Sequence, residues 1–113
     1  MSEFTFMYRG RELPESPEKM QKHMEKWRAW FKELESNGHI KDLGHALESS
    51  GKVVAGKQKV VSDGPYAEAK DVVGGYTLIE AKDLKHAAEL AKGCPILEAG
   101  GSVEVRPVQQ VSM

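Results

Sequence analysis

The sequence predicts a single α+β domain, and three observations support this prediction. Its 113 residues match the length of one domain, which buries roughly two-thirds of its unfolded surface. Hydrophobic residues make up 40% and charged residues 29%, as in globular proteins. Two segments with helical periodicity are separated by short aromatic and β-branched runs. We therefore treat residues 1–113 as one domain with interspersed helices and strands.

The first strand and the first helix are predicted near the N-terminus. Residues 4–8 form an aromatic and β-branched run that is typical of a strand. Ser16 and Pro17 predict the start of a helix over residues 17–37, because serine caps free amides and proline has no N–H to lose. The helix is predicted to end before Gly38, because glycine accepts the left-handed conformation that follows a helix C-terminus. The buried face of this helix is predicted from apolar spacings of three and four: Met20, Met24, Trp27, Trp30, Phe31 and Leu34.

The middle of the chain predicts a strand, a hairpin and a turn. Residues 40–47 alternate loosely between apolar and polar and are predicted to form a strand. Residues 52–55 and 58–62 are two further runs on either side of Gly56, and they predict a hairpin-like pair. Asp63-Gly64-Pro65 is a turn signature.

The last third predicts strand, helix and strand. Residues 74–81 form a strand with Thr77 and Ile79 on one side. Asp83 caps a helix that extends to about residue 92, and residues 102–107 form the last strand. The inner face of this helix is predicted to consist of Leu84, Ala87, Ala88 and Ala91.

The predicted order is β-α-β-(hairpin)-β-α-β, which suits a ferredoxin-like sheet with both helices on one face. The other face of such a sheet must be covered. A small protein usually covers it with a second copy related by a two-fold axis, so we expect a homodimer.

Composition and motifs exclude several classes of function. Sixteen basic and seventeen acidic residues give a net charge of -1, which offers no field for nucleic acid or an anionic membrane. The single cysteine, Cys94, suits a reducing compartment, and no segment resembles a signal peptide or a membrane span. We expect a cytoplasmic protein. Neither a metal-ligand spacing nor a nucleotide fingerprint is present, so no metal and no cofactor are expected.

The order of several short motifs resembles that of the YCII-related (DGPF) family along nearly the whole chain. Residues 63–70 read Asp-Gly-Pro-Tyr-Ala-Glu-Ala-Lys and are followed by Gly74-Gly75-Tyr76, which is similar to the DGPF signature. The upstream and downstream matches are Trp27, Trp30, Leu34, Gly38, Gly44 and Leu47, then Cys94-Pro95 and residues 103–108. The resemblance implies a dimeric α+β barrel, in which two ferredoxin-like sheets pack together.

What the resemblance implies about function is limited. The YCII branch carries a proposed histidine–aspartate pair, and one relative dechlorinates a hydroxylated aromatic compound. The DGPF branch is often encoded near alternative sigma factors. At the positions of the histidine and the aspartate this chain has Trp27 and Cys94, which cannot perform the same acid–base chemistry.

Six residues are candidates for a site. Asp63 is either a general base at a pocket or a residue that only stabilises the turn. His23 lies on the apolar stripe of the first helix and is either a proton carrier or a boundary histidine. The candidate ligand-binding residues are Tyr66, Glu68, Arg106 and Trp27, of which Trp27 is also a candidate core residue.

Two functions remain open from the sequence. The first is a module that binds a small organic ligand or a protein partner connected with transcription. The second is a cofactor-independent enzyme (a lyase, isomerase or dehalogenase) acting on a small polar or aromatic molecule, with Asp63 as acid or base. Fold analogy does not decide between them.

Overall fold

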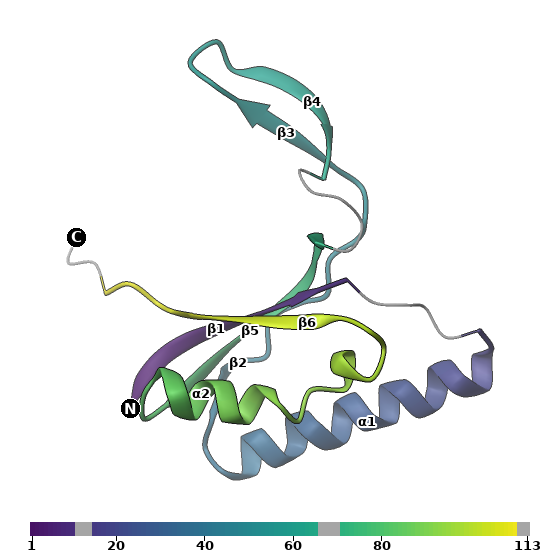
Figure 1. Ribbon diagram of the computed structural model, residues 1–113, viewed down its shortest axis with the longest axis vertical. Coiled ribbons are helices and arrows are strands. Elements are labelled where there is room, and N and C mark those ends of the chain that lie inside the picture. Colours follow the sequence, from purple (N-terminus) through teal and green to yellow (C-terminus); the bar gives the residue numbers. More distant parts are fainter. Residues whose placement is uncertain (11–14, 66–70, 111–113) are drawn as a thin grey trace.

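The described residues form a four-stranded antiparallel sheet, two α-helices and a separate hairpin. In Figure 1 the helices lie below the sheet and the hairpin projects away from it. The computed structural model describes residues 1–10, 15–65 and 71–110. The strand order β2-β5-β1-β6 confirms the predicted ferredoxin-like sheet. Its strands are β1 (Ser2–Arg9), β2 (Ile40–Asp42), β5 (Val73–Ala81) and β6 (Ser102–Pro107).

Both helices begin at the predicted capping residues and lie on the same face of the sheet (Figure 1). At the start of α1 (Pro17–Ser36), Ser16 Oγ accepts a 3.2 Å hydrogen bond from the amide of Lys19. At the start of α2 (Leu84–Ala91), Asp83 Oδ1 accepts one of 2.8 Å from the amide of His86. A short 3-10 turn, η2 (Pro95–Leu97), follows α2. In the part of the chain that the structure describes, neither helix has the length and apolar character to cross a bilayer.

The core lies between the helices and the inner face of the sheet. From Phe4 onward every second residue of β1 is buried there, and the Phe6 ring stacks on Trp30 of α1 with centroids 6.0 Å apart. Burying one such side chain stabilises the fold by about 1.5–3 kcal/mol. The other buried apolar residues are Phe4, Tyr8, Trp27, Leu34, Ile79, Ala81, Ala87, Ala91, Cys94 and Ile96.

The predicted hairpin forms a two-stranded sheet of its own from β3 (Gly51–Ala55) and β4 (Val60–Gly64). We call residues 51–64 the arm, because they project away from the body of the protein (Figure 1). Val54 lies opposite Val61 in the register of this pair. The turn predicted at Asp63 is wrong in its position, because β4 continues through Gly64 and places Asp63 in a strand.

Three other predictions about elements are wrong. Met20 and Met24 are 37% and 40% exposed, because α1 buries residues only in its second half, from Trp27 onward. Leu84 and Ala88 are likewise exposed, so α2 is buried mainly through Ala87 and Ala91. The strand predicted over residues 40–47 ends at Asp42, and the chain continues as a loop with one isolated bridge, from Ala46 to Gly75.

The outer face of the sheet, away from the helices, is half-buried and partly apolar. Met7 and Tyr76 lie opposite each other on β1 and β5, and Thr5 lies opposite Leu78. Among the described elements, no helix covers this face (Figure 1).

Candidate functional site

A large cleft lies between α1 and the end of the sheet where β1 ends and β5 begins. Its volume is about 1010 Å³. Met24, Trp27 and Phe31 of α1 form one wall, and Tyr8 of β1 and Thr77 of β5 belong to the sheet side. The other described lining segments are residues 43–50, 72–76, Gly10, Pro65 and Ile96.

The loop of residues 43–50 forms the rim of the cleft because β5 holds its backbone. The amide of Tyr76 donates to the backbone oxygen of His45 at 3.2 Å, and the amide of Leu47 donates to that of Gly74 at 2.9 Å. Gly44 has φ +71, and a Cβ built there would lie 1.9 Å from the backbone oxygen of Tyr76. Only glycine fits this crossing, because it tolerates a positive φ and has no Cβ.

A buried hydrogen-bond chain connects the sheet to this rim. The Tyr8 hydroxyl donates to Thr77 Oγ1 at 2.7 Å, and the Thr77 hydroxyl donates to the backbone oxygen of Leu43 at 2.9 Å. Burial raises the pKa of the Tyr8 phenol above its ordinary value. Tyr8 is therefore a neutral group that positions the loop, and it is a poor base near neutral pH.

Cys94 is a buried thiol with 2% of its surface exposed. Burial raises the pKa of this thiol to about 12. Since the thiolate is the reactive form, Cys94 is a packing residue rather than a nucleophile.

Trp27 and His23 are adjacent on α1 and are joined to each other. The indole Nε1–H of Trp27 donates a 3.0 Å hydrogen bond to Nε2 of His23. Trp27 is buried and lines the cleft, whereas His23 is half-buried and is not among the residues that line it. His23 has a side-chain partner that sequence reasoning did not identify.

Asp63 lies on the arm, away from the described lining residues of the cleft. Its side chain is 90% exposed, and its Oδ1 lies 2.7 Å from Nζ of Lys52 on the neighbouring strand. Its proposed role as a base stays a prediction. Pro65 lines the cleft, but neither Asp63 nor His23 is among its described lining residues. The cleft therefore does not bring Asp63 and His23 together.

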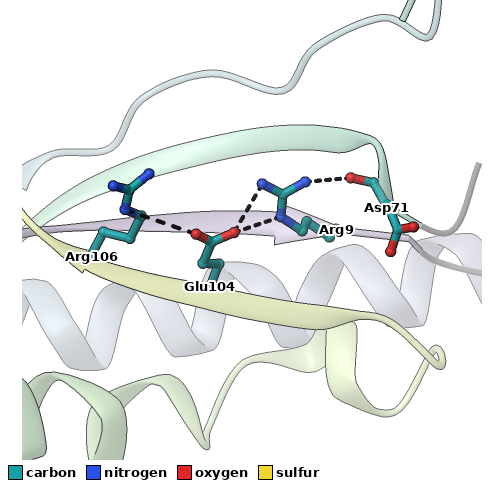
Figure 2. Close-up of polar contacts among 4 residues, drawn as sticks. All are labelled: Arg9, Asp71, Glu104 and Arg106. Carbon is teal, nitrogen blue, oxygen red and sulfur yellow. Dashed lines mark hydrogen bonds and ion pairs between the residues drawn. The ribbon is translucent and has the colours of Figure 1, made fainter. Parts of the chain in front are cut away.

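Arg106 belongs to a polar chain along the outer face of the sheet, shown in Figure 2. Its Nε lies 3.9 Å from Oε2 of Glu104, and Oε1 of Glu104 accepts a 2.9 Å hydrogen bond from Nε of Arg9. Arg9 also donates from Nη1 to the backbone oxygen of Asp71. The described contacts therefore engage Arg106 with Glu104 on the sheet face opposite the helices. Tyr66 and Glu68 lie outside the described residues, as does Lys70.

Sequence reasoning missed the polar lining groups His45, Glu48, Tyr8 and Thr77. A signal was present for Thr77, since it is a polar residue on the inward side of a strand whose neighbours on that side are apolar. His45 offered no such signal, because its position at the rim depends on the loop path. Across the described ranges, no group of three histidine, cysteine, aspartate or glutamate side chains is placed to hold a metal ion.

Comparison with known proteins identifies a family. The model of the YCII-related domain matches residues 4–112. A search of curated proteins gave no match. Among solved structures, the chain is similar to 5-chloro-2-hydroxyhydroquinone dehydrochlorinase from Burkholderia phenoliruptrix AC1100, in complex with 2,5-dihydroxybenzoquinone. Identity is 17%, the match covers 96% of this chain and 95% of that one, and the TM-score is 0.45.

Proposed function

We propose that this chain, which belongs to the YCII-related domain family, binds a small organic molecule in the cleft between α1 and the sheet. The observation that supports this is the cleft, with a volume of about 1010 Å³ and a largely apolar and aromatic lining. Ligand pockets typically have volumes of ~300–1,000 Å³ and such linings, with a few polar groups. The expectation of a protein partner connected with transcription stays a prediction.

The lining favours an uncharged aromatic ligand. Trp27 and Phe31 offer two aromatic rings with centroids 5.5 Å apart. Among the described lining residues, no lysine or arginine is present to compensate the charge of a carboxylate or phosphate. Backbone groups of the rim are the polar groups that orient such a ligand, because the hydroxyls of Tyr8 and Thr77 are buried and already bonded within the protein.

A thermal-shift screen tests this proposal. Uncharged aromatic fragments and their carboxylate counterparts are compared, and the uncharged set is expected to raise the melting temperature. Met24→Lys places a charge at the lining and is expected to weaken binding at least about tenfold. Met20→Lys is the matched control, because Met20 is equally exposed on α1 but does not line the cleft. Preference for the carboxylates, or equal effects of both variants, contradicts the proposal.

The second candidate is the cofactor-independent enzyme, and His45 is the observation that favours it. Its side chain is exposed at the rim, lines the cleft and carries an imidazole, the group suited to proton transfer near neutral pH. Fragments that bind are incubated with the wild type, His45→Ala and Asp63→Ala, and products are followed by mass spectrometry. Loss of turnover with retained binding assigns the acid–base role. An unchanged fragment in the wild type argues for the binding module alone.

We also propose that a second copy covers the outer face of the sheet. The half-buried strip of Met7, Tyr76 and Leu78, without a helix above it, supports this proposal. Leu78→Lys is expected to shift a dimer toward monomer in sedimentation experiments. Leu97→Lys is the control, since Leu97 is 44% exposed in η2, outside the sheet.

A further inference from the structure

We propose that the arm of one copy packs against a second copy of this chain. The starting observation is the isolation of the arm. β3 and β4 pair with each other in a sheet that excludes the other four strands, and no other described element packs extensively against them (Figure 1). A two-stranded hairpin without such support is marginally stable in water.

Both faces of the arm carry valines. Val54 and Val61 lie opposite each other on one face, while Val53 and Val60 point to the other. Val54, Val60 and Val61 are 65%, 58% and 59% exposed. A strand with water on one side alternates between apolar and polar residues, whereas a continuous apolar run indicates cover on both sides. The sequence of the arm therefore matches a buried hairpin.

The chain exposes more surface than a compact monomer of its mass, and the excess is comparable to the area that a dimer buries. The structure exposes 8396 Å², whereas a compact monomer of 12.5 kDa exposes about 6,200 Å², a difference of about 2,200 Å² per chain. Obligate homodimers bury ~2,000–5,000 Å² in total. The surplus surface of two chains lies in that range.

The charge distribution supports a second copy as the occupant, because the arm and the rest of the chain have net charges of opposite sign. The arm contains Lys52, Lys57, Lys59 and Asp63, a net charge of +2, so the rest of the chain carries -3 of the total of -1. Lys52 is paired with Asp63 at 2.7 Å, and the other two lysines lie at the tip. Each copy thus has a basic tip and an acidic body. In a dimer with a two-fold axis, the tip of each copy contacts the body of the other, so this contact occurs twice.

Sedimentation and hydrogen exchange test the arm contact on the full chain. The double variant Val54→Lys/Val61→Lys is expected to raise the dimer dissociation constant at least about tenfold. Both positions are exposed within one chain, so the fold tolerates the change, and circular dichroism checks this. Leu84→Lys, at a leucine of α2 that is 48% exposed, is the matched control. The amides of residues 51–55 and 60–64 in the wild type are expected to gain protection as protein concentration rises.

Each other outcome contradicts the proposal. A wild type that stays monomeric at high concentration overturns it, and so does a dimer that both variants leave intact. Protection of the arm that does not depend on concentration shows instead that the arm folds over its own chain. Because Leu78→Lys examines the outer face and the valine variant examines the arm, failure of one interface is distinguishable from failure of the other.

Discussion

The Tyr8 hydroxyl is held 2.7 Å from Thr77 Oγ1 in the core, and the Thr77 hydroxyl bonds the backbone oxygen of Leu43 on the rim of the cleft. Thr77 has no exposed surface, so water does not replace a lost partner there. Thr77 therefore accepts the hydrogen bond of the buried Tyr8 hydroxyl and holds the loop of residues 43–50 in place.

Thr77→Val is expected to be the more damaging of two matched substitutions. It leaves both the Tyr8 hydroxyl and the Leu43 oxygen without their partner, at a cost of about 2–4 kcal/mol in the free energy of unfolding. Tyr8→Phe removes one donor and leaves the bond to Leu43, at about 1 kcal/mol. Urea unfolding measures both. An equal or smaller loss for the valine variant contradicts this role of Thr77.

Stability is expected to fall as the pH rises above about 9. Burial raises the pKa of Cys94 from its ordinary value of 9.0 to about 12, and it also raises that of Tyr8. The folded state therefore holds protons that the unfolded state releases. The stabilising effect is complete below the unfolded pKa and is lost as the pH rises toward the folded pKa.

The measurement for this prediction is urea unfolding between pH 8 and pH 11 in a reducing buffer. Each group contributes a slope of up to about 1.4 kcal/mol per pH unit in its window. Cys94→Ala is expected to lower the overall stability and to flatten the slope by the contribution of one proton. A variant that keeps the full wild-type slope shows that the thiol is not the source.

Gly44→Ala is expected to destabilise the protein by about 3 kcal/mol or more, combining a positive φ with a clash. The new Cβ would lie 1.9 Å from the backbone oxygen of Tyr76. Gly38→Ala is the matched control, because Gly38 has a similar φ of +75 with nothing within 4 Å of the added atom. The control is expected to cost about 1–2 kcal/mol. Equal losses in thermal unfolding would show that the crossing at Tyr76 is not tight.

His23→Ala is expected to cost about 1 kcal/mol of stability, because the indole N–H of Trp27 loses its acceptor. Affinity for cleft ligands should stay within about twofold, since His23 does not line the cleft. His23→Gln keeps an acceptor oxygen and is expected to restore part of the loss. A large loss of affinity in the alanine variant, without loss of stability, would instead show that His23 contacts the ligand.

The fold was predictable because local signals agree with each other along the chain. Ser16 and Asp83 cap the helices as predicted, and inward residues of β5 follow the predicted alternation. The buried extent of α1 was not predictable in the same way. Met20 and Met24 follow the apolar spacing, but they are exposed. Their burial depends on where the sheet ends, and the local sequence of the helix does not contain that information.

The candidate site was only partly predictable, for a related reason. Trp27 could be identified because its position on a helix follows from periodicity, and it lines the cleft. His45 reaches the rim through the path of a loop that contains Gly44 at a positive φ, and this path depends on hydrogen bonds to β5. Asp63 was placed near a pocket by its motif, yet the strand that carries it leads outward with the arm.

The two ends of the arm have a mechanical consequence. Ser49 and Ser50 precede β3, Pro65 follows β4, and all three border the cleft. Because Gly51 pairs with Gly64, the two ends of the arm lie side by side at its base. A tilt of the hairpin about this base would move one border of the opening, so the width of the entrance would follow the angle of the arm. A partner that binds the tip of the arm would therefore also set the width of the entrance to the cleft.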